Sequence, residues 1–184
     1  METTEKIAFL YLRFNGFFLM PHFTVFGLEK EKHVDVLGFR PAGSEEIIGD
    51  ISLCIDKEFI GELGDPENDI LLWAEVGTGY VKDLFHPKKE VYVKKIFGTR
   101  ENLKKIYFNF DKKEVETIVN EGDKIEVSAG RCRKFILERF SQMESDEIGN
   151  LLSGMTKTGS WRWSEEFLAD LLCLRKMGFL TSGN

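Results

Sequence analysis

Two short apolar segments, each carrying one carboxylate, constrain most strongly what this chain can fold into. Residues 68–80 read NDILLWAEVGTGY and contain Glu75, and residues 33–39 read HVDVLGF and contain Asp35. Both segments have the length and aliphatic content of buried strands. A carboxylate inside a buried strand is costly unless a cation, hydrogen bonds or a proton neutralises its charge. Two such residues therefore suggest a bound metal ion.

The composition is that of a soluble globular protein. A chain of 184 residues can bury roughly two-thirds of its unfolded surface. Its 42% hydrophobic and 30% charged residues exclude a disordered chain. The longest apolar stretch, residues 7–18, is interrupted by Arg13 and Asn15, and the first residues, METTEK, lack the features of a signal peptide. We therefore expect a cytoplasmic protein with no membrane partner.

Charge is distributed unevenly along the chain, whose formal net charge is −6. Residues 44–75 hold ten acidic residues against Lys57 alone, whereas residues 82–105 hold eight lysines or arginines against three acidic residues. A second basic cluster consists of Arg131, Arg133, Lys134 and Arg139. A basic run is either a solvated helix face or a surface that meets a phosphate backbone.

Hydrophobic periodicity predicts an α/β fold with a mixed sheet. Segments with helical spacing of apolar residues are interleaved with short runs that have the pattern of strands. The first two strands are expected to pair antiparallel through a turn at residues 27–31. The expected order αβββαβαβα comprises a helix at 3–14, strands at 17–26, 32–39 and 70–76, a helix at 88–97, a strand at 106–110, a helix at 112–120, a strand at 124–128 and a helix at 131–143.

The chain is predicted to contain one core and two additions. The core covers residues 1–143, and it contains an acidic insertion at about 44–67 with a possible helix at 46–59. The composition shifts after Met143, so residues 144–184 are predicted to form a helical C-terminal appendage. This appendage caps the core, forms a homodimer contact or acts as a winged-helix-like module, and packing or dimerisation is the favoured interpretation.

The two acidic strands predict a metal site. Side chains alternate across a strand, so Trp73, Glu75 and residue 77 share one face. Asp35 on the adjacent strand is expected to reach the same spot. Two carboxylates and a main-chain carbonyl, such as that of Val76, are hard oxygen ligands suited to Mg²⁺ or Mn²⁺. Such an ion activates a water and stabilises charge on a phosphate under in-line attack.

The order of these motifs resembles a known family. A helix, the sequence NGFF, a hairpin whose second strand carries VDVL and a third strand ending in AEVxxG are similar to the PD-(D/E)XK nuclease superfamily. Restriction endonucleases and archaeal Holliday junction resolvases share that fold. The resemblance covers about residues 3–128 and implies a restriction-endonuclease-like αβββαβ core. It also implies that Asp35 and Glu75 bind the metal beside the Val76 carbonyl, with Glu5 as an accessory acid.

The chain departs from the family pattern at one position. The family keeps a lysine where this chain has Gly77, and catalysis by charge placement depends on such a preorganised group. Either Lys82 or Lys89, from neighbouring elements, fills the space that the glycine leaves, or the protein is a degenerate member that holds DNA or a protein partner without cutting. Both interpretations stay open.

The sequence therefore predicts a Mg²⁺-dependent DNA endonuclease that uses Asp35, Glu75, Glu5 and Lys82. The alternative is a binding module on the same fold, with the acidic segment as a partner surface; RNA as the substrate also stays open. Each acid has a structural interpretation too. Asp35 is then a strand-end carboxylate bonded to backbone, Glu75 pairs with a lysine of the next helix, and Glu5 is a first-turn acid favoured by the helix dipole.

Overall fold

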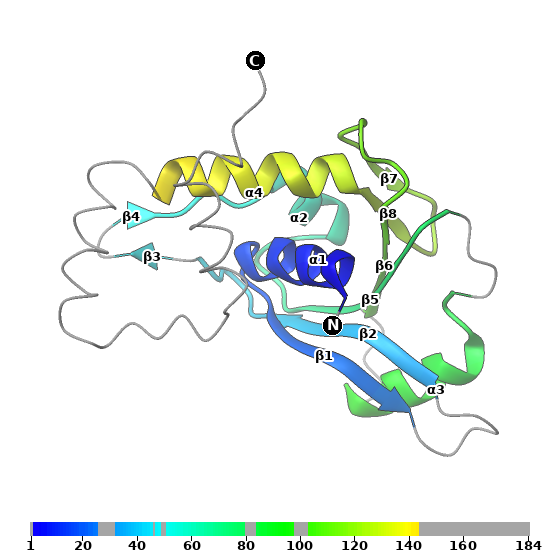
Figure 1. Cartoon of the computed structure of the whole chain (residues 1–184). Coiled ribbons are helices and arrows are strands. Elements are labelled where there is room, and N and C mark those ends of the chain that lie inside the picture. The colour runs from blue at the N-terminus through cyan, green and yellow to red at the C-terminus, as the bar shows by residue number, and fades with distance from the viewer. Residues whose placement is uncertain are drawn as a thin grey trace, which may run out of the picture.

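The computed structural model describes residues 2–25, 32–45, 47–48, 51–79, 84–97 and 103–143 (Figure 1). These residues form an α/β fold with a six-stranded mixed sheet, as the hydrophobic periodicity predicts. The helices are α1 (Thr3–Phe14), α2 (Lys57–Leu63), α3 (Pro87–Ile96) and α4 (Ala129–Met143). The strands are β1 (Phe18–Val25), β2 (Lys32–Arg40), β3 (Ile47–Ile48), β4 (Ile51–Ser52), β5 (Ile70–Gly77), β6 (Leu103–Asn109), β7 (Ile118–Asn120) and β8 (Ile125–Ser128).

The large sheet has the strand order β1-β2-β5-β6-β8-β7. Strands β1, β2 and β5 form an antiparallel meander, which is interrupted in the chain by the insertion that holds β3, β4 and α2. Helix α3 then connects β5 to β6, which pair in parallel. Strand β8 continues the parallel part, and β7 pairs antiparallel with β8 at the far edge. The sheet therefore has one antiparallel half and one mostly parallel half, joined at β5.

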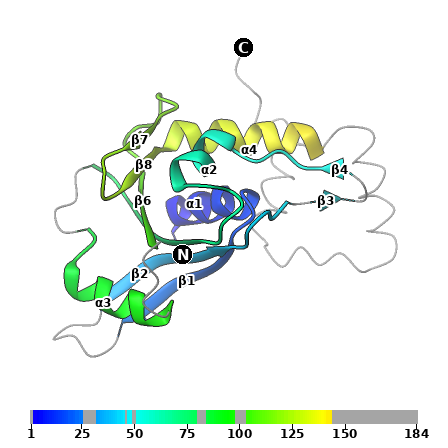
Figure 2. The same cartoon turned by 180° about the vertical axis from the view of Figure 1, so that it is seen from behind.

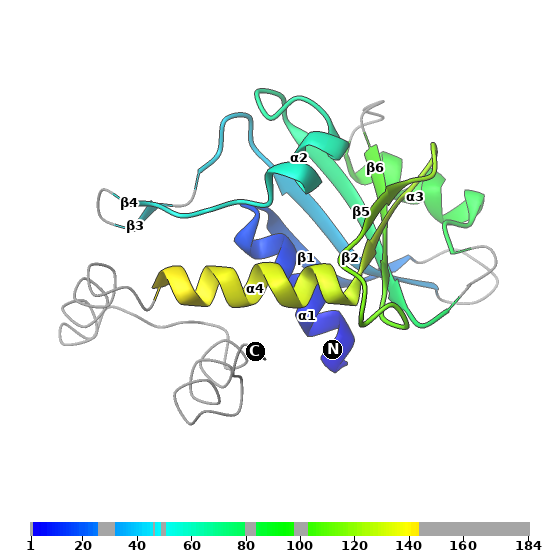
Figure 3. The ribbon, with the colours of Figure 1, turned by 90° about the horizontal axis from the view of Figure 1, so that it is seen from above.

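Helices cover the two faces of the sheet unequally. Figure 3 shows α1 and α4 crossing the same face, and the larger core lies between them and the sheet, with Phe108 from β6 packed against Tyr11 from α1. Helix α3 lies on the other face, where Val93 packs against Trp73 and Leu37. The side chains of Phe135, Ile136 and Phe140 in α4 are buried in the larger core. These side chains pack α4 against α1, where Phe135 lies against Tyr11 and Phe140 against Phe14.

The acidic insertion does not contain the helix predicted at 46–59, so that prediction is wrong. Two-residue strands β3 and β4 pair as a hairpin, and the helix begins only at Lys57. Asp56 explains this start, because its carboxylate accepts a hydrogen bond from the backbone N–H of Phe59 and caps the helix. Figure 2 shows the hairpin beyond the sheet, near the end of α4, where the Gln142 side chain bonds the Cys54 amide at 2.9 Å.

The helix predicted at 112–120 is also wrong. Residues 118–120 form β7, and the preceding segment is held in a loop by Ser128. The Ser128 hydroxyl accepts from the Thr117 amide at 2.9 Å and donates to the Val115 carbonyl at 2.6 Å. These bonds from Ser128 hold residues 115–117 in a loop instead of a helix. The third helix of the expected order αβββαβαβα is therefore absent from the described residues.

Some expectations fall on residues that the structure does not describe. The predicted appendage and homodimer contact at 144–184 lie outside the described residues, as does the turn at 27–31. In the part of the chain that is described, no helix combines the length and apolar character needed to cross a membrane.

Candidate functional site

Strand β2 separates from β5 at Asp35, and the candidate site lies at this point. The antiparallel register runs from Arg40 opposite Ile70 to Val36 opposite Ala74, and one more step would place Asp35 opposite Glu75. The ladder stops before that step. Instead, the Asp35 carboxylate accepts a hydrogen bond of 2.7 Å from the backbone N–H of Val76. The side chain of Asp35 thus takes the place of a backbone carbonyl as the partner of the Val76 amide, where the pairing of β2 with β5 ends.

The structure brings the two predicted acids together. The carboxyl groups of Asp35 and Glu75 are close enough to share a hydrogen bond. Burial raises the pKa of Asp35, and the nearby charge of Glu5 raises it further, against the bond from Val76. Burial also raises the pKa of Glu75 to about 7, although Lys89 lowers it in part. The protein therefore leaves some of the negative charge of this pair uncompensated.

Glu75 has two donors besides its carboxyl neighbour. Its Oε1 atom accepts from the Trp73 indole N–H at 2.7 Å and from the Lys89 ammonium at 2.9 Å. The Lys89 side chain is only 12% exposed and its Nζ lies 5.9 Å from the centre of the Trp73 ring. Of the two lysines considered from the sequence, Lys89 thus reaches Glu75. Lys82 lies outside the described residues.

The start of α3 explains how Lys89 reaches the site. His86 caps the helix by accepting a hydrogen bond from the Lys88 amide, and Pro87 occupies the first helical position. Lys89 consequently lies in the first turn, close to the end of β5. The structural contact expected for Glu75, a lysine on the following helix, is therefore present, and it is also the contact expected of a relocated lysine.

Glu5 lies at the start of α1, where it belongs first to the helix cap. Its Oε2 atom accepts from the Glu2 amide at 2.7 Å in a capping box. The same oxygen lies 3.4 Å from Nε2 of His22 on β1. Glu5 also acts on Asp35 through its charge. Sequence reasoning missed His22, because an isolated histidine in a strand carries no signal until the register is known.

The chain at Val76 and Gly77 offers a backbone ligand. The Gly77 carbonyl accepts from the Phe110 amide at 2.9 Å, so it faces β6. Backbone groups of successive residues in a strand point to opposite neighbours, so the Val76 carbonyl lies on the same side as its amide, which bonds Asp35. The carbonyl that the sequence predicted as a ligand therefore faces the gap between β5 and β2.

These oxygen atoms fit a hard divalent cation. Mg²⁺ is usually held by one or two carboxylates, with water and substrate phosphates completing its shell. The pair of carboxyl groups and the adjacent carbonyl match that pattern, and their uncompensated charge favours a cation. No group of three or more His, Cys, Asp or Glu side chains is placed to enclose a metal within the described ranges. The donor set therefore fits Mg²⁺ or Mn²⁺ held by a few protein oxygens, and it does not form a site in which protein side chains alone surround the ion.

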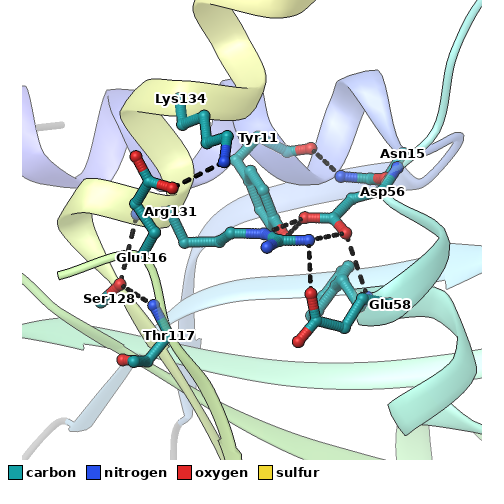
Figure 4. A network of polar contacts seen from close by, with 10 residues as sticks. Tyr11, Asn15, Asp56, Glu58, Glu116, Thr117, Ser128, Arg131 and Lys134 are labelled. Carbon is teal, nitrogen blue, oxygen red and sulfur yellow. Dashed lines mark hydrogen bonds and ion pairs between the residues drawn. The ribbon is translucent and has the colours of Figure 1, made fainter.

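Two members of the second basic cluster of the sequence, Arg131 and Lys134, form ion pairs within the protein (Figure 4). Arg131 donates two hydrogen bonds to Asp56, at 2.8 and 2.6 Å, and also contacts Glu58. Lys134 pairs with Glu116 at 2.7 Å. The contacts of Arg131 with Asp56 and Glu58 link α4 to the insertion, so the solvated or phosphate-binding face suggested by the sequence does not describe Arg131.

Comparisons with family models, with curated proteins and with solved structures give no significant match to this chain. The functional interpretation therefore rests on the residues and their geometry.

Proposed function

We propose that this protein is a Mg²⁺-dependent DNA endonuclease built on a restriction-endonuclease-like core. One observation carries the proposal: Asp35 and Glu75 meet where β2 leaves β5, and Lys89 contacts Glu75. The element order supports it, since α1 precedes an antiparallel meander of three strands and α3 leads to a parallel fourth strand. This is the αβββαβ order of the PD-(D/E)XK superfamily, which the sequence motifs resemble.

The carboxylates of Asp35 and Glu75, with the Val76 carbonyl, would hold the ion. When bound, Mg²⁺ supplies Lewis acidity and lowers the pKa of a coordinated water. Glu75 in turn positions Lys89, because their ion pair fixes the ammonium beside the carboxylate pair. That ammonium takes the place of the lysine missing at Gly77, and it offers hydrogen bonds to an attacking water and to a phosphate oxygen.

A cleavage assay with matched variants tests the proposal. Plasmid DNA, a four-way DNA junction and single-stranded RNA are incubated with the protein in Mg²⁺ or Mn²⁺. Asp35→Asn, Glu75→Gln and Lys89→Met should each lower the cleavage rate about 100-fold or more, because each removes a charge at the reacting phosphate. The neighbouring exposed lysine, Lys88, serves as the control, and Lys88→Met should cut at close to the wild-type rate.

Two outcomes contradict the proposal. Wild-type protein that leaves every substrate intact in both metals is not an endonuclease of this class. Cleavage that persists undiminished in Glu75→Gln comes from a contaminant or from another site. Cleavage of the RNA alone would keep the metal chemistry and change the substrate.

The same ion pair favours a second candidate function. Lys89 already neutralises part of the charge on Glu75 without a metal, which is what a degenerate nuclease fold that only binds DNA or a protein partner would require. Mn²⁺ distinguishes the two functions. A ligand that binds only the folded state raises its melting temperature. Millimolar Mn²⁺ should raise the melting temperature of the wild-type protein and should not raise that of Asp35→Asn. If Mn²⁺ shifts the melting temperatures of the two proteins equally, the binding module is supported.

A further inference from the structure

We propose that His22 is a positioning residue of the candidate site, which holds the Glu5 carboxylate beside Asp35. This inference rests on the proposed function, because it assigns a further side chain to the same metal-dependent site. Three observations carry it: the place of His22 in the sheet register, its backbone conformation and its contact with Glu5.

The register places His22 in the same row as the two acids. Along β1 and β2 the paired residues run from Phe18 opposite Phe39 to Val25 opposite Lys32, and this spacing would put His22 opposite Asp35. That one pair is missing from the ladder. The β2–β5 register would in turn put Asp35 opposite Glu75. The β1–β2 ladder thus skips one row and the β2–β5 ladder ends at the same row, and that row contains the three side chains.

The backbone of His22 is strained. Its φ of +51° makes it the one non-glycine residue with a positive φ in the described part of the chain. Histidine tolerates this region better than most residues, but the conformation is still costly in a strand. Such strain persists only where the surrounding structure imposes it, and it is found frequently at functional sites.

At His22 the side chains of β1 change the face of the sheet to which they point. In a regular strand Leu19 and Phe23 would face the same side, yet Leu19 packs against the core under α1 and Phe23 packs against the cluster under α3. Strand β2 shows the same change, with Val36 in the first cluster and Val34 in the second. The two strands therefore change faces together, at the row that contains His22 and Asp35.

The imidazole of His22 contacts Glu5 at the row where the strands change faces. Its Nε2 atom lies 3.4 Å from Oε2 of Glu5, while the side chain remains 44% exposed. Glu5 acts on Asp35 through its charge, so a displaced Glu5 would weaken the negative potential that attracts a cation. His22 and the amide of Glu2 hold the same carboxylate oxygen, and together they keep Glu5 directed at the site.

Substitution at His22 separates positioning from simple backbone geometry. His22→Gly should melt about 2–4 °C above His22→Ala, because glycine accepts a positive φ without strain. Both variants should bind Mn²⁺ about three- to tenfold more weakly than wild type, because Glu5 is no longer held. His22→Gln keeps an N–H donor of similar reach, so its Mn²⁺ affinity should recover toward the wild-type value.

His33 provides the matched control, since it is an exposed histidine on β2 that contacts Thr24 and not Glu5. His33→Ala should bind Mn²⁺ as wild type does. Mn²⁺ affinity is measured by titration on the full chain, and cleavage rates are taken alongside at saturating Mn²⁺. The affinity gives a readout that a purely structural role of His22 would leave unchanged.

The outcomes distinguish this inference from the proposed function. If wild-type protein binds Mn²⁺ and cuts DNA, and His22→Gly equals it in both, the positioning role is overturned and the endonuclease stands. A loss in His22→Gly that His22→Gln does not restore also overturns the positioning role. If wild-type protein neither binds Mn²⁺ nor cuts, the proposed function fails and the role of His22 in it fails as well.

Discussion

Asp56 on one side of the molecule, and the pair of Asp35 and Glu75 on the other, are acids withdrawn from water whose charges the protein treats in opposite ways. Asp56 accepts hydrogen bonds from the Tyr11 hydroxyl at 2.6 Å, from the Phe59 amide at 3.2 Å and twice from Arg131. Burial alone would raise the pKa of Asp56, but these donors hold it below its usual value. Asp35 and Glu75 instead face each other, and the pKa of each is raised.

The difference separates a structural acid from a candidate functional one. Each oxygen of Asp56 accepts two hydrogen bonds, so this carboxylate joins α1, α2 and α4 and has little capacity left for a ligand (Figure 4). At Asp35 and Glu75 the donors are too few for two charges. Perturbed, incompletely paired carboxylates at the end of a strand are typical of binding and catalytic sites.

The largest expected effect is at the structural acid. Asp56→Asn removes the charge that pairs with Arg131 and leaves the half-buried guanidinium with only the exposed Glu58 as a partner, so the free energy of unfolding should fall by about 3 kcal/mol. Urea denaturation measures this loss. Glu58 contacts the same arginine from an exposed position, and Glu58→Ala should cost less than about 1 kcal/mol. Equal losses in the two variants would remove the distinction between Asp56 and a surface ion pair.

An intermediate effect is expected in the pH dependence of stability. The pKa of Glu75 rises to about 7 on folding, from an ordinary value of 4.5. Its protonation therefore favours the folded state below pH 4.5, and this contribution is lost as the pH rises toward 7. The pKa of Asp56 is lowered, so its contribution is present at neutral pH and is lost on acidification. Without divalent metal, Glu75→Gln should flatten the stability profile between pH 4.5 and 7 by about 1–3 kcal/mol.

Melting curves across this pH range provide the check. Asp56→Asn should leave the slope between pH 4.5 and 7 unchanged and should flatten the acid limb below it. A wild-type profile without any slope between these pH values would show that Glu75 is fully compensated by Lys89, and the contrast between the two regions would then be lost.

The smallest expected effect has the opposite sign. Asp35→Asn should stabilise the metal-free protein by on the order of 1 kcal/mol, because it removes one of two neighbouring negative charges. The asparagine amide oxygen still accepts from the Val76 amide, and its N–H groups can donate to Glu75. The same substitution, Asp to Asn, thus destabilises at residue 56 and stabilises at residue 35. Destabilisation at both positions would contradict the functional interpretation of Asp35.

Much of the fold was predictable because its signals are local. The helix at 3–14 was predicted with its observed bounds, and β1, β2, β5, α3, β8 and α4 lie within two residues of expectation at each end. The predictions at 46–59 and 112–120 failed for another reason. There, Asp56 caps a helix that packs on Arg131, and Ser128 holds a loop from across the sheet. Contacts between distant residues decided both segments.

The residues of the candidate site also fall into two groups, those that the sequence predicts and those that only the fold reveals. Asp35 and Glu75 stand out in the sequence because a carboxylate in an apolar strand is rare and costly. The departure at Gly77 was also visible, and it reduced the choice of lysine to two neighbours. Nothing in the sequence ranked Lys89 above Lys82, and nothing placed His22 near Glu5, since both contacts depend on the register of the sheet and on the position of α3.

The sequence by itself determined the element types and the two acids, because strand alternation, helix spacing and the cost of burying charge act over a few residues. The tertiary structure alone decided which buried acid is compensated. The fold brings Arg131, which lies far away in the chain, to Asp56. It brings to Asp35 a second carboxylate, that of Glu75, and the backbone amide of Val76. Electrostatic free energy depends on the distance between charges and on their exposure to water, and only the packed fold sets both.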